Sequence, residues 1–456
     1  MAEALSVYNS SLMAETLVEP ARRLAEAIDG KTARVGVIGL GYVGLPLLLE
    51  FARGGYPVLG FDVDREKVTR LKRGESYIAH IPAARIRGAL DEGRFDATSD
   101  FTRLAEADAI LICVPTPLTP QREPDLSYIE NTADAIAGSL RPGQLVVLES
   151  TTYPGTTEEV VQPRLEAAGL KVEEDFFLAF SPEREDPGNS QYSTRTIPKI
   201  VGGVGPQSAR LAEALYQGTL DRVVRVSSAR VAEAVKILEN TYRAVNIALV
   251  NELKVTFEPM DIDIWEVIEA AKTKPFGFAP FYPGPGLGGH CIPIDPFYLT
   301  WKAREYGLST RFIELAGEIN TGMPHHVVRR LASALNEDGK CLRGARVLVL
   351  GVAYKRNIED MRESPAAEII ELLQQAGARA DYHDPHVPHL PKMRRHQFEL
   401  NSVPLDSGLS AYDAAVVVTD HAAVDYAAVG QAVPLVIDTR NVYGRLPRPR
   451  ARVVKA

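Results

Sequence analysis

The residue whose setting points most clearly to chemistry is Cys291, in the stretch PGPGLGGHCIPIDP at positions 283–296. Its glycines and prolines predict a loop, and glycine lets a backbone approach a ligand closely. A nucleophilic cysteine must be a thiolate, so it needs positive charge or a proton acceptor nearby. Asp295 follows four residues later. For a lone cysteine on such a loop, a chemical and a structural role are both open.

A cation could come from the segment 229–272, which has almost no turn signals before its one proline and repeats apolar residues every three or four positions. This predicts one long helix. Lys236 and Asn240 are four positions apart and therefore share a helix face. A lysine between Val235 and Ile237 is costly to bury without a role, although it could also extend to solvent.

Polar side chains also follow three expected strands. Glu183 comes just after the apolar run at 177–180 and is a candidate general base. Pro115 and Thr116 follow a strand at 109–114, and Thr151 follows another at 145–149. Ligands of open α/β sheets lie at such strand ends, so these residues could contact a cofactor or substrate. Ordinary turn chemistry remains the alternative.

The clearest motif is GLGYVG at 39–44, which fits G-x-G-x-x-G, follows an apolar β-branched run and opens a helical segment. In this context it is the fingerprint of a dinucleotide site: the glycines allow a tight turn, close approach of a pyrophosphate, and packing of helix on strand. The pyrophosphate would bind the N–H groups at the helix start. The predicted cofactor contacts within the motif are Gly39, Gly41, Tyr42, Val43 and Gly44.

Asp62, 18 residues after Gly44, ends the next expected strand. A carboxylate there hydrogen-bonds the ribose hydroxyls and repels a 2′-phosphate, so it favours NAD. Arg65 could instead serve NADP or stack on adenine. We predict NAD.

The elements around these residues alternate strand and helix, which predicts a parallel sheet covered on both faces. Beyond residue 345 the pattern returns, with a helix starting near Ser364 and stopping at Gly377. The expected fold class is α/β, with two Rossmann-like doubly wound domains joined by a long central helix and a helical middle domain. The predicted parts are an N-terminal extension at 1–32, a NAD-binding domain at 33–225, a central helical dimerisation domain with the cysteine loop at 226–330, and a C-terminal nucleotide-sugar-binding domain at 331–456.

The composition excludes some classes of function. The 456 residues are 45% hydrophobic and 24% charged, as in globular proteins. The net charge of −8 argues against general nucleic-acid binding, which needs a basic surface. Three widely spaced cysteines give neither a disulfide framework nor a C-x-x-C metal pattern, so no metal is expected. With no signal sequence or membrane-length apolar run recognised, we expect a cytoplasmic protein.

Taken together, the motifs resemble the nucleotide-sugar 6-dehydrogenase family, which includes UDP-glucose dehydrogenase. The motifs GLGYVGLP, GFDVD, VPTP, ESTTYPGTT, SPER, AEAVKILENTYRAVNIALVNEL, GPGLGGHCIPIDP and GVAYKRNIEDMRESPA occur in that order between about residues 34 and 443. The resemblance implies two Rossmann-like domains joined by a long helix that builds a homodimer. It also implies two NAD-dependent oxidations at carbon 6 of a sugar, from alcohol through aldehyde to carboxylate.

The resemblance also implies roles for single residues. Cys291 would hold the aldehyde as a thiohemiacetal and then as a thioester, and Lys236 with Asn240 would stabilise oxyanions. Asp295 would order a water or assist proton transfer. Glu183 would activate the hydrolytic water.

Thr151 would hold that water or the nicotinamide end of the cofactor, Lys355 would meet the nucleotide sugar, and Arg362 would meet the cofactor pyrophosphate. A covalent adduct suits a double oxidation because the aldehyde would otherwise escape. The predicted substrate contacts are Glu183, Arg184, Lys236, Asn240, Tyr282, Gly286, Gly289 and Lys355.

Ile294 bears on the sugar, because UDP-glucose dehydrogenases usually carry lysine at that position. The surrounding sequence looks like the branch acting on UDP-N-acetylhexosamines, and most like the UDP-N-acetylglucosamine enzymes. UDP-N-acetylmannosamine, UDP-glucose and GDP-mannose remain alternatives. Pro187 stands where UDP-glucose enzymes have a second glutamate, and Glu185 stands where this branch has an apolar residue, for which we have no account.

Two other classes of protein share part of this pattern. A hydroxyacid or 6-phosphogluconate type of Rossmann oxidoreductase also places lysine and asparagine on a helix, but it performs one oxidation and needs no cysteine loop. A non-catalytic NAD sensor would require a broken site, whereas every expected catalytic residue is present in the sequence.

Overall fold

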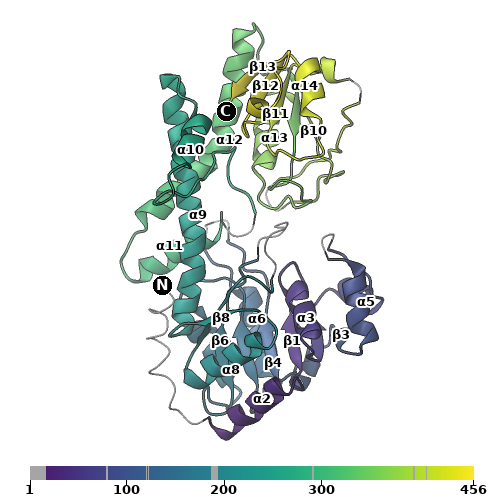
Figure 1. The fold of residues 1–456 in the computed structure, drawn as a ribbon, viewed down its shortest axis with the longest axis vertical. Helices are drawn as coiled ribbons and strands as arrows, with labels where there is room; N and C mark the ends of the chain where they lie inside the picture. The colour runs from purple at the N-terminus through teal and green to yellow at the C-terminus, as the bar shows by residue number, and fades with distance from the viewer. Residues whose placement is uncertain are drawn as a thin grey trace. The chain divides into compact units, whose positions relative to one another are not determined.

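The computed structural model describes residues 17–78, 81–119, 121, 123–185, 194–289, 292–393, 396–406 and 408–456. Cys291 and Pro187 lie outside the described residues. The chain divides into two compact units, up to Glu239 and from Asn240 onward, and each is considered by itself. Figure 1 shows a sheet flanked by helices in each.

The first unit is built on an eight-stranded sheet with the order β3-β2-β1-β4-β5-β6-β7-β8. The paired strands run parallel except β6 and β7, which are antiparallel. The strands are β1 (Val35–Ile38), β2 (Val58–Phe61), β3 (Phe95–Thr98), β4 (Ala109–Ile112), β5 (Leu145–Leu148), β6 (Phe177–Phe180), β7 (Lys199–Gly203) and β8 (Val223–Arg225).

Both faces of this sheet are buried, because successive side chains of a strand point to opposite sides. Val35 and Val37 of β1 pack in one core cluster with α2, α3 and α8, whereas Ile38 packs in the other with α6 and α7. Buried parallel strands read as continuous apolar runs, which is why β1, β4, β5 and β6 were visible in the sequence. The helices are α2 (Glu19–Asp29), α3 (Gly44–Arg53), α4 (Arg65–Lys72), α5 (Ala83–Asp91), α6 (Ser127–Ala137), α7 (Gln162–Glu166) and α8 (Pro206–Gln217).

The segment expected to be one helix over 229–272 is interrupted. Helix α9 (Ala229–Phe257) is followed by a short 3-10 turn and then by α10 (Ile264–Ala271). Pro259 lacks an N–H and disfavours the helical conformation of the residue before it. Asp261 then adopts a positive φ of 56°, which turns the chain. The prediction of a single helix was therefore wrong beyond Phe257.

The second unit contains a five-stranded, all-parallel sheet with the order β10-β9-β11-β12-β13. Its strands are β9 (Arg346–Leu350), β10 (Arg379–His383), β11 (Ala414–Val417), β12 (Leu435–Asp438) and β13 (Arg452–Lys455). Its further helices are α11 (Asp295–Glu305), α12 (Arg311–Glu337), α13 (Pro365–Gln375) and α14 (Tyr426–Ala432). The helix expected from Ser364 to Gly377 is confirmed: Ser364 caps α13, and Gly377 turns the chain at a φ of 83°. Among the described residues, no helix is long and apolar enough to cross a membrane.

Candidate active site

The glycine loop after β1 has the three properties that a dinucleotide site requires. Gly39 has a φ of 91°, and a Cβ there would lie 2.6 Å from the carbonyl oxygen of Cys113. A Cβ on Gly44 would lie 2.0 Å from the carbonyl oxygen of Gly39, so only glycine lets α3 start so close to the turn. A Cβ on Gly41 would meet nothing within 4 Å, so its backbone faces open space.

The start of α3 and the end of β2 complete this site. No side chain caps α3, so its first N–H groups are not taken by a capping side chain. Asp62 is buried beside the loop, and its Oδ2 accepts a hydrogen bond from the N–H of Leu40 (3.0 Å). Lys67, which the sequence did not single out, places its Nζ 3.4 Å from the same oxygen. Arg65 is exposed at the first position of α4. An open glycine turn, an uncapped helix start and a fixed carboxylate fit a dinucleotide with free ribose hydroxyls.

The polar residues at the ends of β4 and β5 tie these two strands together. The Thr116 hydroxyl donates to the carbonyl oxygen of Thr151 (2.8 Å), and the Ser150 hydroxyl donates to that of Val114 (2.7 Å). Pro115 is exposed beside them. The structure thus brings the predicted residues Pro115, Thr116 and Thr151 together at the carboxyl edge of the sheet, where α/β proteins bind ligands.

Lys236 is buried and does not extend to solvent. Its Nζ donates to the backbone carbonyl of Glu183 (2.5 Å), so the first unit brings the predicted cation and the predicted base together. The Glu183 carboxylate accepts from the N–H groups of Arg184 and Glu185 through Oε1, at 2.7 and 2.6 Å. Its Oε2 lies 3.2 Å from Nζ of Lys199, which sequence reasoning missed. The Arg184 side chain pairs with Glu239 rather than with the Glu183 carboxylate.

Asn240 and Asp295 meet in the second unit. Nδ2 of Asn240 donates to Oδ2 of Asp295 (2.6 Å), and both side chains are buried. Asp295 is the first residue of α11 and follows directly on Ile294. Two residues 55 positions apart, each expected to be catalytic, are therefore hydrogen-bonded to each other.

The described part of the cysteine loop is fixed by backbone bonds on both sides. Asn251 of α9 accepts from the N–H of Gly284 (2.9 Å), and the N–H of Gly289 donates to the carbonyl of Arg362 (3.0 Å). Gly286 and Gly289 have φ values of 134° and 86°. A Cβ on Gly289 would lie 3.0 Å from the ring of Tyr354, so this glycine also serves close packing.

Two predicted ligand residues of the second unit, Arg362 and Tyr282, pair with side chains of the same unit. The guanidinium of Arg362 pairs with Asp360. The Tyr282 hydroxyl donates to Glu269 of α10 (2.6 Å), and its ring stacks on Trp265. Lys355 is half-buried in the loop that follows β9.

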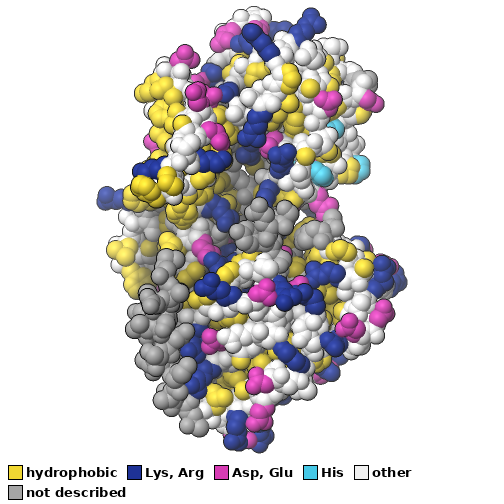
Figure 2. All heavy atoms as spheres, in the orientation of Figure 1, with side chains coloured by type: hydrophobic (Ala, Val, Ile, Leu, Met, Phe, Trp, Pro, Cys, Tyr) yellow, Lys and Arg dark blue, Asp and Glu magenta, His cyan; other side chains and the backbone are white. Residues whose placement is uncertain are grey.

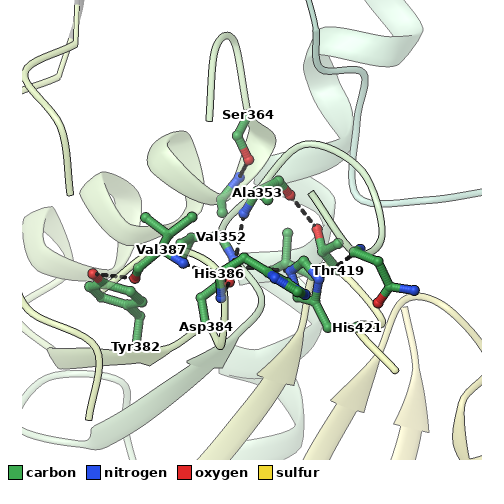
Figure 3. A network of polar contacts seen from close by, with 12 residues as sticks. Val352, Ala353, Ser364, Tyr382, Asp384, His386, Val387, Thr419 and His421 are labelled. Carbon is green, nitrogen blue, oxygen red and sulfur yellow. Dashed lines mark hydrogen bonds and ion pairs between the residues drawn. The ribbon is translucent and has the colours of Figure 1, made fainter. Parts of the chain in front are cut away.

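That loop is shaped by Asp384, at the end of β10 (Figure 3). The buried Asp384 carboxylate accepts from the N–H groups of Val352, Ala353, His386 and Val387, and from Nε2 of His421. Burial opposes ionisation, but these donors hold its pKa at about 2. The arrangement parallels Asp62 and Leu40 in the first unit, except that the Asp384 side chain is fully buried and leaves no surface for a ribose. The only signal for Asp384 in the sequence is the polar segment His383-Asp384-Pro385 at the end of an expected strand.

Comparison with known proteins identifies the chain as a whole. Residues 33–220 match the NAD binding domain of the UDP-glucose/GDP-mannose dehydrogenase family, residues 230–322 match its central domain, and residues 348–445 match its UDP binding domain. The chain belongs to the UDP-glucose/GDP-mannose dehydrogenase family. It is therefore an NAD-dependent oxidoreductase of the nucleotide-sugar 6-dehydrogenase class, and the predicted fold class and cofactor are confirmed.

Similar members of the family differ in the sugar that their names specify. A UDP-N-acetyl-D-glucosamine 6-dehydrogenase from Pseudomonas aeruginosa is 37% identical over 86% of this chain and 91% of its own length. A UDP-N-acetyl-D-mannosamine dehydrogenase from Pyrococcus horikoshii is 35% identical over 91% of this chain and 97% of its own. A solved structure of the UDP-D-ManNAc dehydrogenase from P. horikoshii superposes with a TM-score of 0.83, covering 92% of this chain and 98% of that one. The family is established, and the sugar must be argued separately.

Proposed function

We propose that this enzyme oxidises carbon 6 of UDP-N-acetylglucosamine to the uronic acid in two NAD-dependent steps, through a thiohemiacetal and a thioester on Cys291. The observation that carries the proposal is the pairing of predicted catalytic groups from distant segments. Lys236 is buried against the main chain of Glu183, and Asn240 against Asp295. Polar groups buried at such cost are expected where chemistry requires them.

Each of these residues has a definite task. The Cys291 thiolate adds to the aldehyde, and Lys236 neutralises the oxyanion that develops, because a fixed cation in a dry site stabilises charge more than water does. Glu183 takes a proton from the water that hydrolyses the thioester. Asn240 holds the Asp295 carboxylate in place, and this carboxylate orders water or carries a proton.

The cofactor would be held by the loop at 39–44 and by Asp62. The backbone of Gly41 and the start of α3 bind the pyrophosphate, and Asp62, oriented by the Leu40 N–H, binds the adenosine ribose. When bound, NAD accepts the hydride in each oxidation. Thr151, Thr116 and the adjacent Pro115 would contact the nicotinamide side of the cofactor.

The choice of sugar rests on Ile294 and on the relatives. Two curated relatives at 37% and 36% identity are named UDP-N-acetyl-D-glucosamine 6-dehydrogenases. UDP-N-acetylmannosamine is the second candidate, because the P. horikoshii enzyme covers more of the chain and its structure superposes closely. Both sugars carry the 2-acetamido group that UDP-glucose lacks.

We also propose a homodimer that forms through α9. Val231, Leu238, Tyr242 and Leu249 are 40%, 69%, 52% and 51% exposed, and they recur at intervals of seven and four along the helix. Hydrophobic side chains gather over α9 and α10 at the left of Figure 2. An exposed apolar stripe of this kind is typical of an interface.

The test is NAD reduction measured side by side with UDP-N-acetylglucosamine, UDP-N-acetylmannosamine, UDP-glucose and GDP-mannose. The proposal expects the highest kcat/KM for UDP-N-acetylglucosamine. A higher value for its mannosamine epimer would transfer the assignment to the second candidate. A preference for UDP-glucose or GDP-mannose would refute the argument from Ile294.

A further inference from the structure

A buried cluster of ionisable groups surrounds Glu183 in the first unit. Lys199, in the antiparallel strand β7, is 4% exposed, and its Nζ lies 2.6 Å from Oε2 of Glu149 and 3.2 Å from Oε2 of Glu183. Glu149, directly after β5, also accepts from the hydroxyl of Tyr216 on α8. Cys113, at the end of β4, is a further titratable neighbour of Lys199, and burial raises the pKa of its thiol.

Burying a lysine this deeply destabilises the folded protein unless opposite charges compensate its ammonium group. Lys199 has two carboxylates around it, although one would neutralise it. A simple structural ion pair would need only Glu149, which is buried and close. A structural ion pair does not explain the second contact of Lys199, which is with Glu183, the residue assigned to water activation.

The hydrogen bonds to the Glu183 carboxylate show what the contact with Lys199 contributes. Oε1 accepts two backbone N–H groups, and Oε2 accepts the Lys199 ammonium. A carboxylate offers about four acceptor positions. Among the described residues three are used, which leaves one on Oε2 for a water.

We propose that Lys199 is a positioning residue for Glu183: its ammonium holds the carboxylate ionised and in one orientation for thioester hydrolysis. This inference rests on the proposed function. In the step concerned, the water oxygen bonds to the acyl carbon, one water proton passes to Glu183, and Cys291 leaves as the thiolate. The uronic acid formed and the protonated Glu183 then each lose one proton to solvent, which restores the carboxylate of Glu183.

The electrostatics agree in direction. Burial alone would raise the pKa of Glu183, but Lys199, the N–H groups of residues 184 and 185, and Lys236 hold that pKa below its usual value. Burial raises the pKa of Glu149 to about 6. Glu183, rather than Glu149, is therefore the carboxylate that remains charged when the pH falls, and Lys199 is the group that lowers its pKa most.

Replacing the lysine tests this through the pH profile. Lys199→Met removes the largest of the effects that oppose burial, so the acid limb of the kcat–pH profile should move up by about one pH unit or more. Because the Glu183 carboxylate also loses the contact that orients it, hydrolysis at pH 7 should slow roughly 10- to 100-fold. Because breaking one partner of a buried pair can prevent folding, the double variant Lys199→Met/Glu149→Gln replaces the whole pair by neutral groups. The shifted limb must persist in the double variant, since it belongs to Glu183; its return to the wild-type position would overturn the proposal.

Two further variants identify the carboxylate whose titration causes the shift of the acid limb. Glu149→Gln alone removes a negative charge, so its acid limb must stay at or below the wild-type pH. Glu185 titrates in the same range, because burial and the neighbouring Glu183 raise its pKa to about 7. Adding Glu185→Gln to the double variant must leave the shifted limb in place; loss of the limb would assign it to Glu185 and refute the inference.

A covalent readout separates this inference from the proposed function. The double variant, mixed with NAD and UDP-N-acetylglucosamine, should give a rapid burst of two NADH per site, followed by slow turnover. Intact-protein mass spectrometry after quenching should find the acyl group on Cys291. A normal steady rate without adduct would overturn the role of Lys199 and leave the enzyme assignment standing. If the wild-type protein reduces no NAD with any of the four nucleotide sugars, the proposed function itself fails.

Discussion

The glycine loop offers a matched pair of substitutions with opposite expected effects. In Gly44→Ala the new methyl group would lie 2.0 Å from the backbone oxygen of Gly39, where no side chain can yield. Overpacking of this kind costs about 1–3 kcal/mol, which for a unit of this size lowers the apparent Tm by roughly 2–12 °C. In Gly41→Ala the methyl group meets nothing within 4 Å, and the φ of this residue is not positive, so the Tm should stay within about 2 °C.

NAD binding, in contrast to stability, should be weakened by Gly41→Ala. The methyl group of Gly41→Ala occupies the space through which a pyrophosphate reaches the backbone. Loss of one charged hydrogen bond, about 1.5–3 kcal/mol, raises the Kd for NAD roughly 10- to 100-fold. Scanning fluorimetry without ligand and calorimetric titration with NAD measure the two quantities. A Gly41→Ala protein that binds NAD within twofold of wild type, or a Gly44→Ala protein as stable as wild type, would refute this reading of the loop.

Three further predictions concern single side chains. Cys291→Ser should abolish uronate production, and full turnover by this variant would exclude the thioester route. Asp62→Ala should raise the KM for NAD roughly tenfold or more while leaving the KM for the sugar nearly unchanged, and equal effects on both would contradict the ribose assignment. Lys254 is buried without a hydrogen-bond partner among the described residues, and burial lowers its pKa to about 7. The unfolded chain then binds the extra proton between pH 7 and about 10.5, so wild-type stability should rise with pH across that range. Lys254→Met should remove this rise and be the more stable protein at pH 7, and identical Tm–pH curves for the two proteins would contradict the burial argument.

The parts of the fold that sequence predicted are those with a local signal. Buried parallel strands are continuous apolar runs, and α13 carries its cap and its terminating glycine within the sequence itself. Strand β7 escaped notice because it contains Lys199 and two glycines, and β8 because it has three residues. Gly202 is required there by a neighbouring segment: a Cβ would lie 2.1 Å from the backbone of Ser228.

The residues of the candidate site likewise fall into those with a local sequence signal and those without one. The glycine loop and Asp62 were visible because their spacing is short and fixed by one βαβ unit. Lys236 could be singled out as a lysine on an apolar helix, but its contact with Glu183 crosses 53 positions. Lys199 had no local signal, since its role depends on contacts with Glu149 and Glu183, which follow other strands.

The most direct test of the central claim is the stoichiometry of the complete reaction. A limiting amount of UDP-N-acetylglucosamine is consumed with excess NAD, and NADH is compared with the sugar used and the uronate formed. Two successive oxidations at one carbon require two NADH per sugar and one uronate, with no aldehyde released. One NADH per sugar, or free aldehyde as the end product, would contradict the account and leave a simple alcohol dehydrogenase.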